Sequence, residues 1–272
     1  MTKNLRIIFD NAHDAATLSA TSEALPITNT QRSGRSYVWR STDLAEQVIT
    51  GVTDGALSVN AVVVYQHNLT NLATVRVELI RNNDVVYDSG EMVASELIPL
   101  GEWQAGVDPW GGSQLTELPN VQLSVWMPDI FIDRYRITIN DPDNPDGFIQ
   151  TERFVVGSYY SPVFNASYGP QLDWEDSSEH KRTESGSINT ISGNVFRRLT
   201  VDLNHLDSSD RSALTLNALK SGKGGDVFVS LYPEKGGIDE AEHEFLARRE
   251  NSYSHTHNRF RNWKTQLVYV EV

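Results

Sequence analysis

The 272-residue chain contains no cysteine. Disulfide bridges, thiolate metal ligands and thiol nucleophiles are therefore excluded. Long apolar runs are missing too. Residues 1–14 are too polar for a signal peptide, and no window approaches the roughly 18 apolar residues of a membrane helix. These absences predict a soluble protein that is synthesised in a cytoplasm and does not insert into a membrane.

Positive charge is scarce, with 23 Lys and Arg against 36 Asp and Glu and a formal net charge of −13. Because such a chain repels a phosphate backbone, nucleic acid is not predicted as a partner. Five basic residues do gather late in the sequence, and Glu242, Glu244 and Glu250 lie among them. The five are Arg248, Arg249, Arg259, Arg261 and Lys264. We interpret this group as a solvated face.

Apolar side chains, 39% of the total, are sufficient for a core and follow strand patterns. Residues 57–67 are apolar at both alternating positions, which is typical of a strand covered on both faces. Leu57, Val59, Ala61, Val63 and Tyr65 are expected on one side, with Val62 and Val64 on the other. Residues 74–79 alternate between apolar and polar, as in a half-exposed strand, and the turn residues at 82–84 predict a hairpin back to residues 85–87.

The pattern changes after residue 157, where a polar stretch rich in Tyr and Ser begins. Residues 207–221 are the best helix candidate, with Asp207 or Ser208 at its start and Gly222 after its end. Residues 237–250 fit either a helix or a strand, and we favour a strand at 244–249. The sequence thus predicts a mainly β protein with two β-sandwich or jelly-roll-like domains, residues 1–157 and 158–272, and one short helix in the second.

Few residues have the spacing of a chemical site. His255 and His257 could share one face of a strand and bind a metal with His243 or Glu244, but polar neighbours favour a loop or edge strand. His67 is interpreted as a strand-ending residue that bonds to backbone. Residues 141–147 resemble a calcium loop but fail the EF-hand register, since position 5 is Pro145. Calcium held by loop carbonyls stays an alternative.

No serine lies in a nucleophile elbow, and residues 222–225 lack the spacing of a phosphate loop. We therefore predict no catalytic residue, no metal and no cofactor. Two tryptophans, Trp103 and Trp110, lie in a long segment rich in Gly and Pro. They either plug the end of a sheet or form a contact surface for a sugar or a protein partner.

Several short segments follow one another in the first 157 residues. They are Asn29-Thr30-Gln31, Trp39-Arg40-Ser41-Thr42, Gln47-Val48-Ile49, Val62-Val63-Val64, His67-Asn68-Leu69-Thr70, Ala73-Thr74-Val75-Arg76-Val77, Tyr87-Asp88-Ser89-Gly90, Tyr135-Arg136-Ile137 and Phe154-Val155-Val156-Gly157. In this order they resemble the discoidin-like (galactose-binding-like) jelly roll of tailed-bacteriophage structural proteins. Tyr168-Gly169, Arg197-Arg198-Leu199, the helix and residues 227–233 are similar to the C-terminal region of such proteins.

The resemblance implies a structural, non-enzymatic component of a phage tail tip or baseplate. Its partners would be other tail proteins and further copies of itself, and its location would be the virion. The alternative is a carbohydrate-binding module that contacts a host-surface glycan, with Trp103 and Trp110 as contact residues. An enzyme acting on polysaccharide or peptidoglycan is a third hypothesis, which no residue pattern favours.

Overall fold

The computed structural model describes residues 3–94, 97–98, 113–114 and 122–272. Strands dominate these residues, which confirms the mainly β prediction. The chain divides into two compact units. The first unit comprises Met1–Ser161 and Val227–Phe245, and the second comprises Pro162–Asp226 and Leu246–Val272. The predicted domains 1–157 and 158–272 stay a prediction, because compactness alone does not show that a segment folds by itself. None of the helices within the described ranges is long and apolar enough to span a membrane.

The first unit contains most of the strands. Its elements are β1 (Arg6–Ile8), η1 (Ala12–Ala15), β2 (Thr17–Ala20), η2 (Ile27–Gln31), β3 (Trp39–Arg40), β4 (Gln47–His67), β5 (Thr74–Arg81), β6 (Asp84–Val93), β7 (Leu97–Ile98), β8 (Ser113–Gln114), β9 (Gln122–Asn140), β10 (Gln150–Gly157), β11 (Tyr159–Tyr160) and α2 (Gly237–Glu242). Strands β16 (Asp226–Ser230) and β17 (Glu244–Arg249) cross the division between the units. The predicted hairpin is present, with Asn82 and Asn83 at positive φ between β5 and β6.

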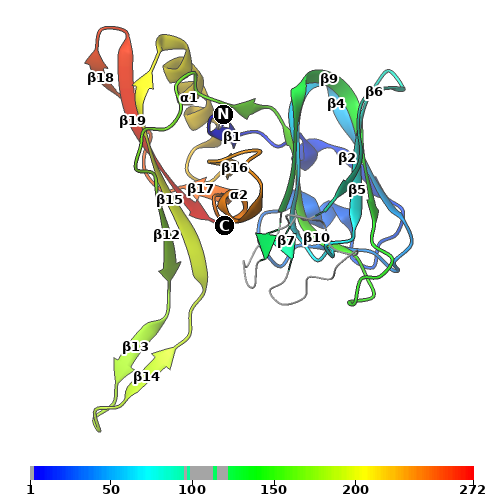
Figure 1. The fold of residues 1–272 in the computed structure, drawn as a ribbon, viewed down its shortest axis with the longest axis horizontal. Coiled ribbons are helices and arrows are strands. Elements are labelled where there is room, and N and C mark those ends of the chain that lie inside the picture. Colours follow the sequence, from blue (N-terminus) through cyan, green and yellow to red (C-terminus); the bar gives the residue numbers. More distant parts are fainter. Residues whose placement is uncertain (1–2, 95–96, 99–112, 115–121) are drawn as a thin grey trace. The chain divides into compact units, whose positions relative to one another are not determined.

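Two long strands, β4 and β9, organise the first unit (Figure 1). They pair antiparallel along most of their length and curve together, with shifts in register between Val52 and Leu57 and between Val59 and Ala61. The end of β4 pairs with β10, whereas its beginning pairs with β2. The end of β9 pairs with β5. One continuous strand pair therefore contributes to both layers of a β-sandwich.

The apolar core of this sandwich draws on every long strand. Val59, Val62 and Val64 of β4 belong to it, together with residues such as Ile137 and Phe154. The predicted grouping of Val59 with Ala61 and Val63 is wrong. The pairing with β9 is irregular between Val59 and Ala61, where β4 advances two residues while β9 advances four, from Ile130 to Trp126, and the side of β4 that faces the core changes across this irregularity.

The opposite face of β4 is covered as well, as residues 57–67 predicted. Ala61, Val63 and Tyr65 are buried, and the Tyr65 ring meets Phe228 of β16 edge-on at 6.3 Å. On β9, the ring of Trp126 packs against Tyr159 at 5.4 Å. Trp39 is fully buried in the core, whereas Trp126 lies on this outer face and is partly buried.

The second unit contains an antiparallel sheet with a protruding hairpin. Its elements are β12 (Gln171–Asp176), β13 (Glu179–Arg182), β14 (Ile188–Ile191), β15 (Val195–Leu206), α1 (Ser208–Ser221), β18 (Thr256–Arg259) and β19 (Asn262–Glu271). Strand β15 pairs with β12 and β19, and β19 also pairs with β18. Helix α1 confirms the predicted helix, because Asp207 caps its first turn and Gly222 follows its end at positive φ.

Candidate functional site

The two predicted contact residues, Trp103 and Trp110, lie outside the described residues. The structure therefore neither supports nor contradicts their role. The remaining candidates are buried polar networks and exposed segments.

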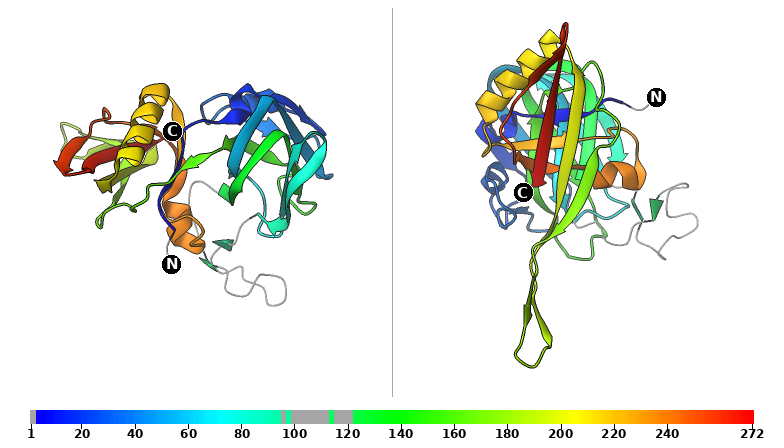
Figure 2. Two further views of the ribbon diagram at one scale, coloured as in Figure 1. Left: turned by 90° about the horizontal axis from the view of Figure 1, so that it is seen from above. Right: turned by 90° about the vertical axis from the view of Figure 1, so that its left-hand side faces the viewer.

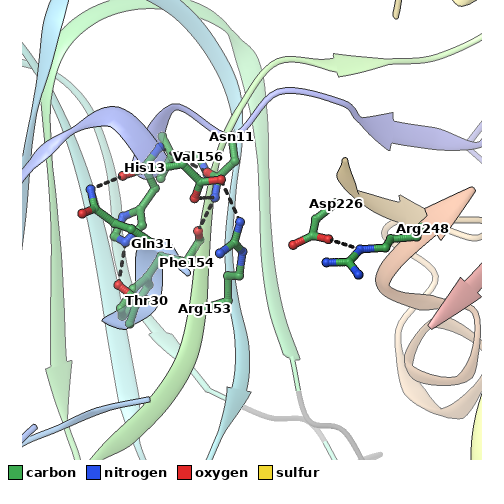
Figure 3. A network of polar contacts seen from close by, with 10 residues as sticks. Asn11, His13, Thr30, Gln31, Arg153, Phe154, Val156, Asp226 and Arg248 are labelled. Atoms are coloured by element: carbon green, nitrogen blue, oxygen red, sulfur yellow. Dashed lines mark hydrogen bonds and ion pairs between the residues drawn. The ribbon is translucent and has the colours of Figure 1, made fainter. Parts of the chain in front are cut away.

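One buried network centres on His13, which the sequence patterns did not single out (Figure 3). Its imidazole lies with Nδ1 2.6 Å from the Tyr135 hydroxyl and Nε2 2.7 Å from Thr30 Oγ1. Thr30 donates its own proton to the carbonyl of Ile27, so Thr30 Oγ1 accepts a hydrogen bond from Nε2–H. Nδ1 then accepts from Tyr135. This arrangement satisfies a neutral imidazole, and burial, with help from Arg153, lowers the pKa of His13 to about 3.

Gly51 makes room for this network. Gly51 and Tyr135 are cross-strand partners, and a Cβ on Gly51 would lie 2.1 Å from Cζ of the Tyr135 ring. Asn11 and Arg153 border the same region. Asn11 bonds to the backbone of Phe154 and Val156 (Figure 3). Arg153 pairs with Asp14. Asn11 and Asp14 therefore tie the N-terminal segment to β10, whereas His13 ties it to β9 and to η2.

The region around His67 and Asp141 is closed. Asp141 is buried, and its carboxylate accepts hydrogen bonds from the Thr70 amide and hydroxyl and from Asn144. His67 Nδ1 accepts from the amide of Leu69, and burial lowers the pKa of His67 to about 4. The prediction that His67 bonds to backbone is confirmed. The oxygens of Asp141 are satisfied by protein donors, so the loop needs no calcium ion to stabilise it.

Glu244 is another buried titratable group in the first unit. Its carboxyl group accepts hydrogen bonds from Ser124 of β9 and Ser230 of β16. Burial, together with the negative charge of Glu240, raises the pKa of Glu244 to about 8. Glu240 in turn accepts from the amides of Glu234 and Gly236. Glu244 therefore carries a proton at neutral pH and joins β9, β16 and α2.

The histidines considered as metal ligands do not converge. His257 stacks on Trp263, and His255 lies against Tyr253, while Glu244 is engaged with the two serines. Across the described ranges, no group of three His, Cys, Asp or Glu side chains is placed to hold a metal ion.

The late basic residues have different environments. Arg248 pairs with Asp226 at 2.8 Å (Figure 3). Arg249 is buried and donates to the carbonyls of Ala218 and Gly222 at the end of α1, where a cation stabilises the helix dipole. The prediction of a solvated face is therefore wrong for Arg249. It fits Arg259 and Arg261, which are exposed.

The most exposed element is the β13–β14 hairpin, which we call the arm. It extends from β12 and β15 as a thin two-stranded ribbon (Figures 1 and 2). Every residue from 179 to 195 is exposed, including Ile188 and Ile191. Sequence reasoning assigned this stretch only a polar character, because its strands are four residues long and carry no alternating apolar pattern.

Comparisons with known proteins give structural neighbours only. No family model matches the chain, and no curated protein sequence matches it. Solved structures similar to it include a family 32 carbohydrate-binding module of Clostridium perfringens NanJ in complex with galactose, with 16% identity, covering 57% of this chain and 99% of that one, TM-score 0.39. Another is the module CpGH89CBM32-5 of Clostridium perfringens in complex with GalNAc-beta-1,3-galactose. It is 12% identical, the match covers 55% of this chain and 100% of that one, and the TM-score is 0.38. A third is a Streptococcus pneumoniae fucose-binding module, which is 10% identical. The match covers 56% of this chain and 99% of that one, with a TM-score of 0.37. Similarity at this level carries no conclusion about what this chain binds.

Proposed function

We propose that this protein is a non-catalytic structural component of a larger assembly and that its arm contacts another subunit. The observation that carries this proposal is that every residue from 179 to 195 is exposed. A two-stranded hairpin alone is marginally stable in water, and three or more strands or a packing surface are needed to hold it. An arm of this kind gains its stabilising contacts from a partner.

The residues of the arm fit such a contact. Directly paired residues share a face of a hairpin, so Ile191 lies beside Glu179 and Ile188 lies beside Arg182 on the opposite face. Each face therefore offers one branched apolar side chain among polar ones. Strand β14 carries no charged residue, and charges on an edge strand are a common protection against pairing with other chains. Strand β14 is thus open to pairing with a partner strand.

The particular assembly that we propose is a bacteriophage tail tip or baseplate, with other tail proteins and further copies of this chain as partners and the virion as location. This finer assignment rests on the sequence resemblance alone. The high acidic charge supports it in one respect, because it would keep unassembled copies apart.

The experiment replaces the exposed isoleucines in an Ile188→Asn, Ile191→Asn double variant and follows incorporation of the tagged protein into purified phage particles by mass spectrometry. We expect a folded protein that is strongly depleted from particles. The matched control is Val85→Asn, Val86→Asn on β6 of the first unit, where two apolar side chains are similarly exposed. Normal incorporation of the arm variant, or absence of the native protein from particles, would overturn the proposal.

Carbohydrate binding is a second candidate function, favoured by the placement of Trp103 and Trp110 in a Gly- and Pro-rich segment. Aromatic rings on such segments supply large contact areas to sugars and proteins. A glycan array tests it with the native protein, a Trp103→Ala, Trp110→Ala variant and a control, Phe260→Ala, which removes an exposed ring elsewhere. A signal that is lost only in the double variant would support the candidate, and a blank array for the native protein would reject it.

A further inference from the structure

The β18–β19 hairpin is positively charged, although the protein as a whole is acidic. Residues 251–264 contain Arg259, Arg261 and Lys264 and no acidic residue, although the whole chain has a net charge of −13. Residues 254–261 and Lys264 are all exposed. At the tip, Phe260 is 85% exposed and the Arg261 guanidinium lies 5.3 Å from its ring.

The charge of this hairpin is not neutralised within the described part of the chain. Arg259, Arg261 and Lys264 form no ion pair there, in contrast to Arg248, which pairs with Asp226, and Arg198, which pairs with Glu250. Packing around Trp263 nevertheless holds the hairpin in place. The His257 ring stacks on the Trp263 ring at 4.9 Å, and the Arg211 guanidinium of α1 lies 4.9 Å from the same indole. Strand β18 pairs with β19 on one side only, so its outer edge is open.

A complementary edge lies in the same unit. Strand β12 carries Asp173, Glu175 and Asp176, and it pairs with β15 on one side only. Arg198 reaches Glu175 at 3.5 Å but is already shared with Glu250 at 2.7 Å, so the strand remains acidic overall. Trp174 on this edge strand is 40% exposed. One unit therefore has an open basic edge strand and an open acidic edge strand.

We infer that the β18 edge of one copy docks on the β12 edge of a second copy. Open edges supply backbone donors and acceptors for pairing between chains, and opposite charges select this pairing over others. The occupant is another copy because both complementary edges belong to one sequence, whereas the net charge of −13 makes two copies repel one another in other orientations. Such a head-to-tail contact is heterologous and builds a ring, or a filament if the rotation does not close. The inference rests on the proposed function and specifies how copies associate with one another.

Sedimentation velocity of the full chain tests the inference by charge reversal. The native protein is expected to self-associate at about 0.05 M salt and to weaken at about 0.5 M, because exposed charges are screened. Arg259→Glu with Arg261→Glu should weaken association about tenfold or more, and so should Asp173→Lys with Glu175→Lys. Mixing the two variants restores opposite charges across the contact, so the mixture should associate although neither variant does alone.

The control is Arg35→Glu with Lys223→Glu, two exposed residues outside both edges that change the net charge by the same amount. It should associate almost as the native protein does. Native-like association of either edge variant, failure of the mixture to associate, or a native protein that stays monomeric at about 100 μM would overturn the inference. None of these results touches the proposed function, whose test is incorporation into particles through the arm.

Discussion

Two buried groups of the first unit and one buried pair of the second are stabilised in different ways. In the first unit, the buried groups His13 and Glu244 are neutral at pH 7 because burial shifts the pKa of each toward its uncharged form. In the second unit, Arg197 and Glu271 are both fully buried and both charged. The Arg197 guanidinium contacts both carboxylate oxygens of Glu271, at 3.1 and 2.7 Å, and the Arg197 amide donates to the same carboxylate at 2.9 Å.

The difference predicts which change lowers the stability of each unit most. A buried neutral group needs only its hydrogen bonds, but its stability contribution depends on pH. A buried ion pair is insensitive to moderate pH change, but the loss of one partner leaves an uncompensated charge out of water. The first unit should therefore respond most strongly to pH, and the second to substitution of one partner.

The largest expected effect is that of Glu271→Gln. The variant leaves the Arg197 charge buried without its counter-ion, and we expect a loss of about 3–5 kcal/mol in the free energy of unfolding. Hydrogen exchange of β15 and β19 during urea titration measures it for this unit. The control is Glu250→Gln, which breaks an exposed pair with Arg198 and should cost less than about 1 kcal/mol. Equal effects of the two substitutions would remove the contrast between the units.

The second prediction concerns pH. The unfolded chain loses the Glu244 proton near pH 4.5, whereas the folded chain keeps it until about pH 8, so the contribution of Glu244 to stability falls as pH rises through this whole window. Below pH 6.5, the unfolded chain protonates His13 and His67 while the folded chain does not until about pH 3 and 4, so stability falls as pH falls. These opposed effects place the stability maximum of the first unit near pH 6.5.

Glu244→Gln isolates the alkaline side of this profile. The variant mimics the protonated side chain, so the fall of roughly 1 kcal/mol per pH unit between about pH 6.5 and 8 should disappear. The fall in stability below about pH 6.5 should become steeper, because Glu244 no longer opposes the two histidines there. Thermal melts of both proteins across this range provide the measurement. An unchanged alkaline slope in the variant would show that Glu244 is not the titrating group.

The smallest effect is expected for Tyr135→Phe. It removes the hydroxyl that donates to His13 Nδ1, leaves that acceptor unsatisfied in the core, and should cost about 1 kcal/mol. Chemical denaturation at pH 7 measures the cost, with Tyr37→Phe as an exposed control. If His13 finds another donor, the cost will vanish and the first unit will prove more adaptable than the ion pair of the second.

Local patterns predicted much of the secondary structure. The hairpin at Asn82 and Asn83, helix α1 with its caps, and the strand at 244–249 all follow from residues close in sequence. Local patterns did not predict which side of β4 Val59 faces, because the irregular register there depends on the partner strand β9. The contact role of Trp103 and Trp110 stays a prediction, as do the assignment to a phage tail and the lack of enzymatic activity.

By itself, the sequence determined several of the strands, helix α1, the absence of cysteine chemistry and the acidic charge, because these depend on composition and on neighbouring residues. Only the tertiary structure decided that His13 meets Tyr135 across 122 residues, that Glu244 meets two serines, and that Arg249 caps α1. These contacts join residues far apart in the chain, and the energy of a buried polar group depends on what surrounds it in space.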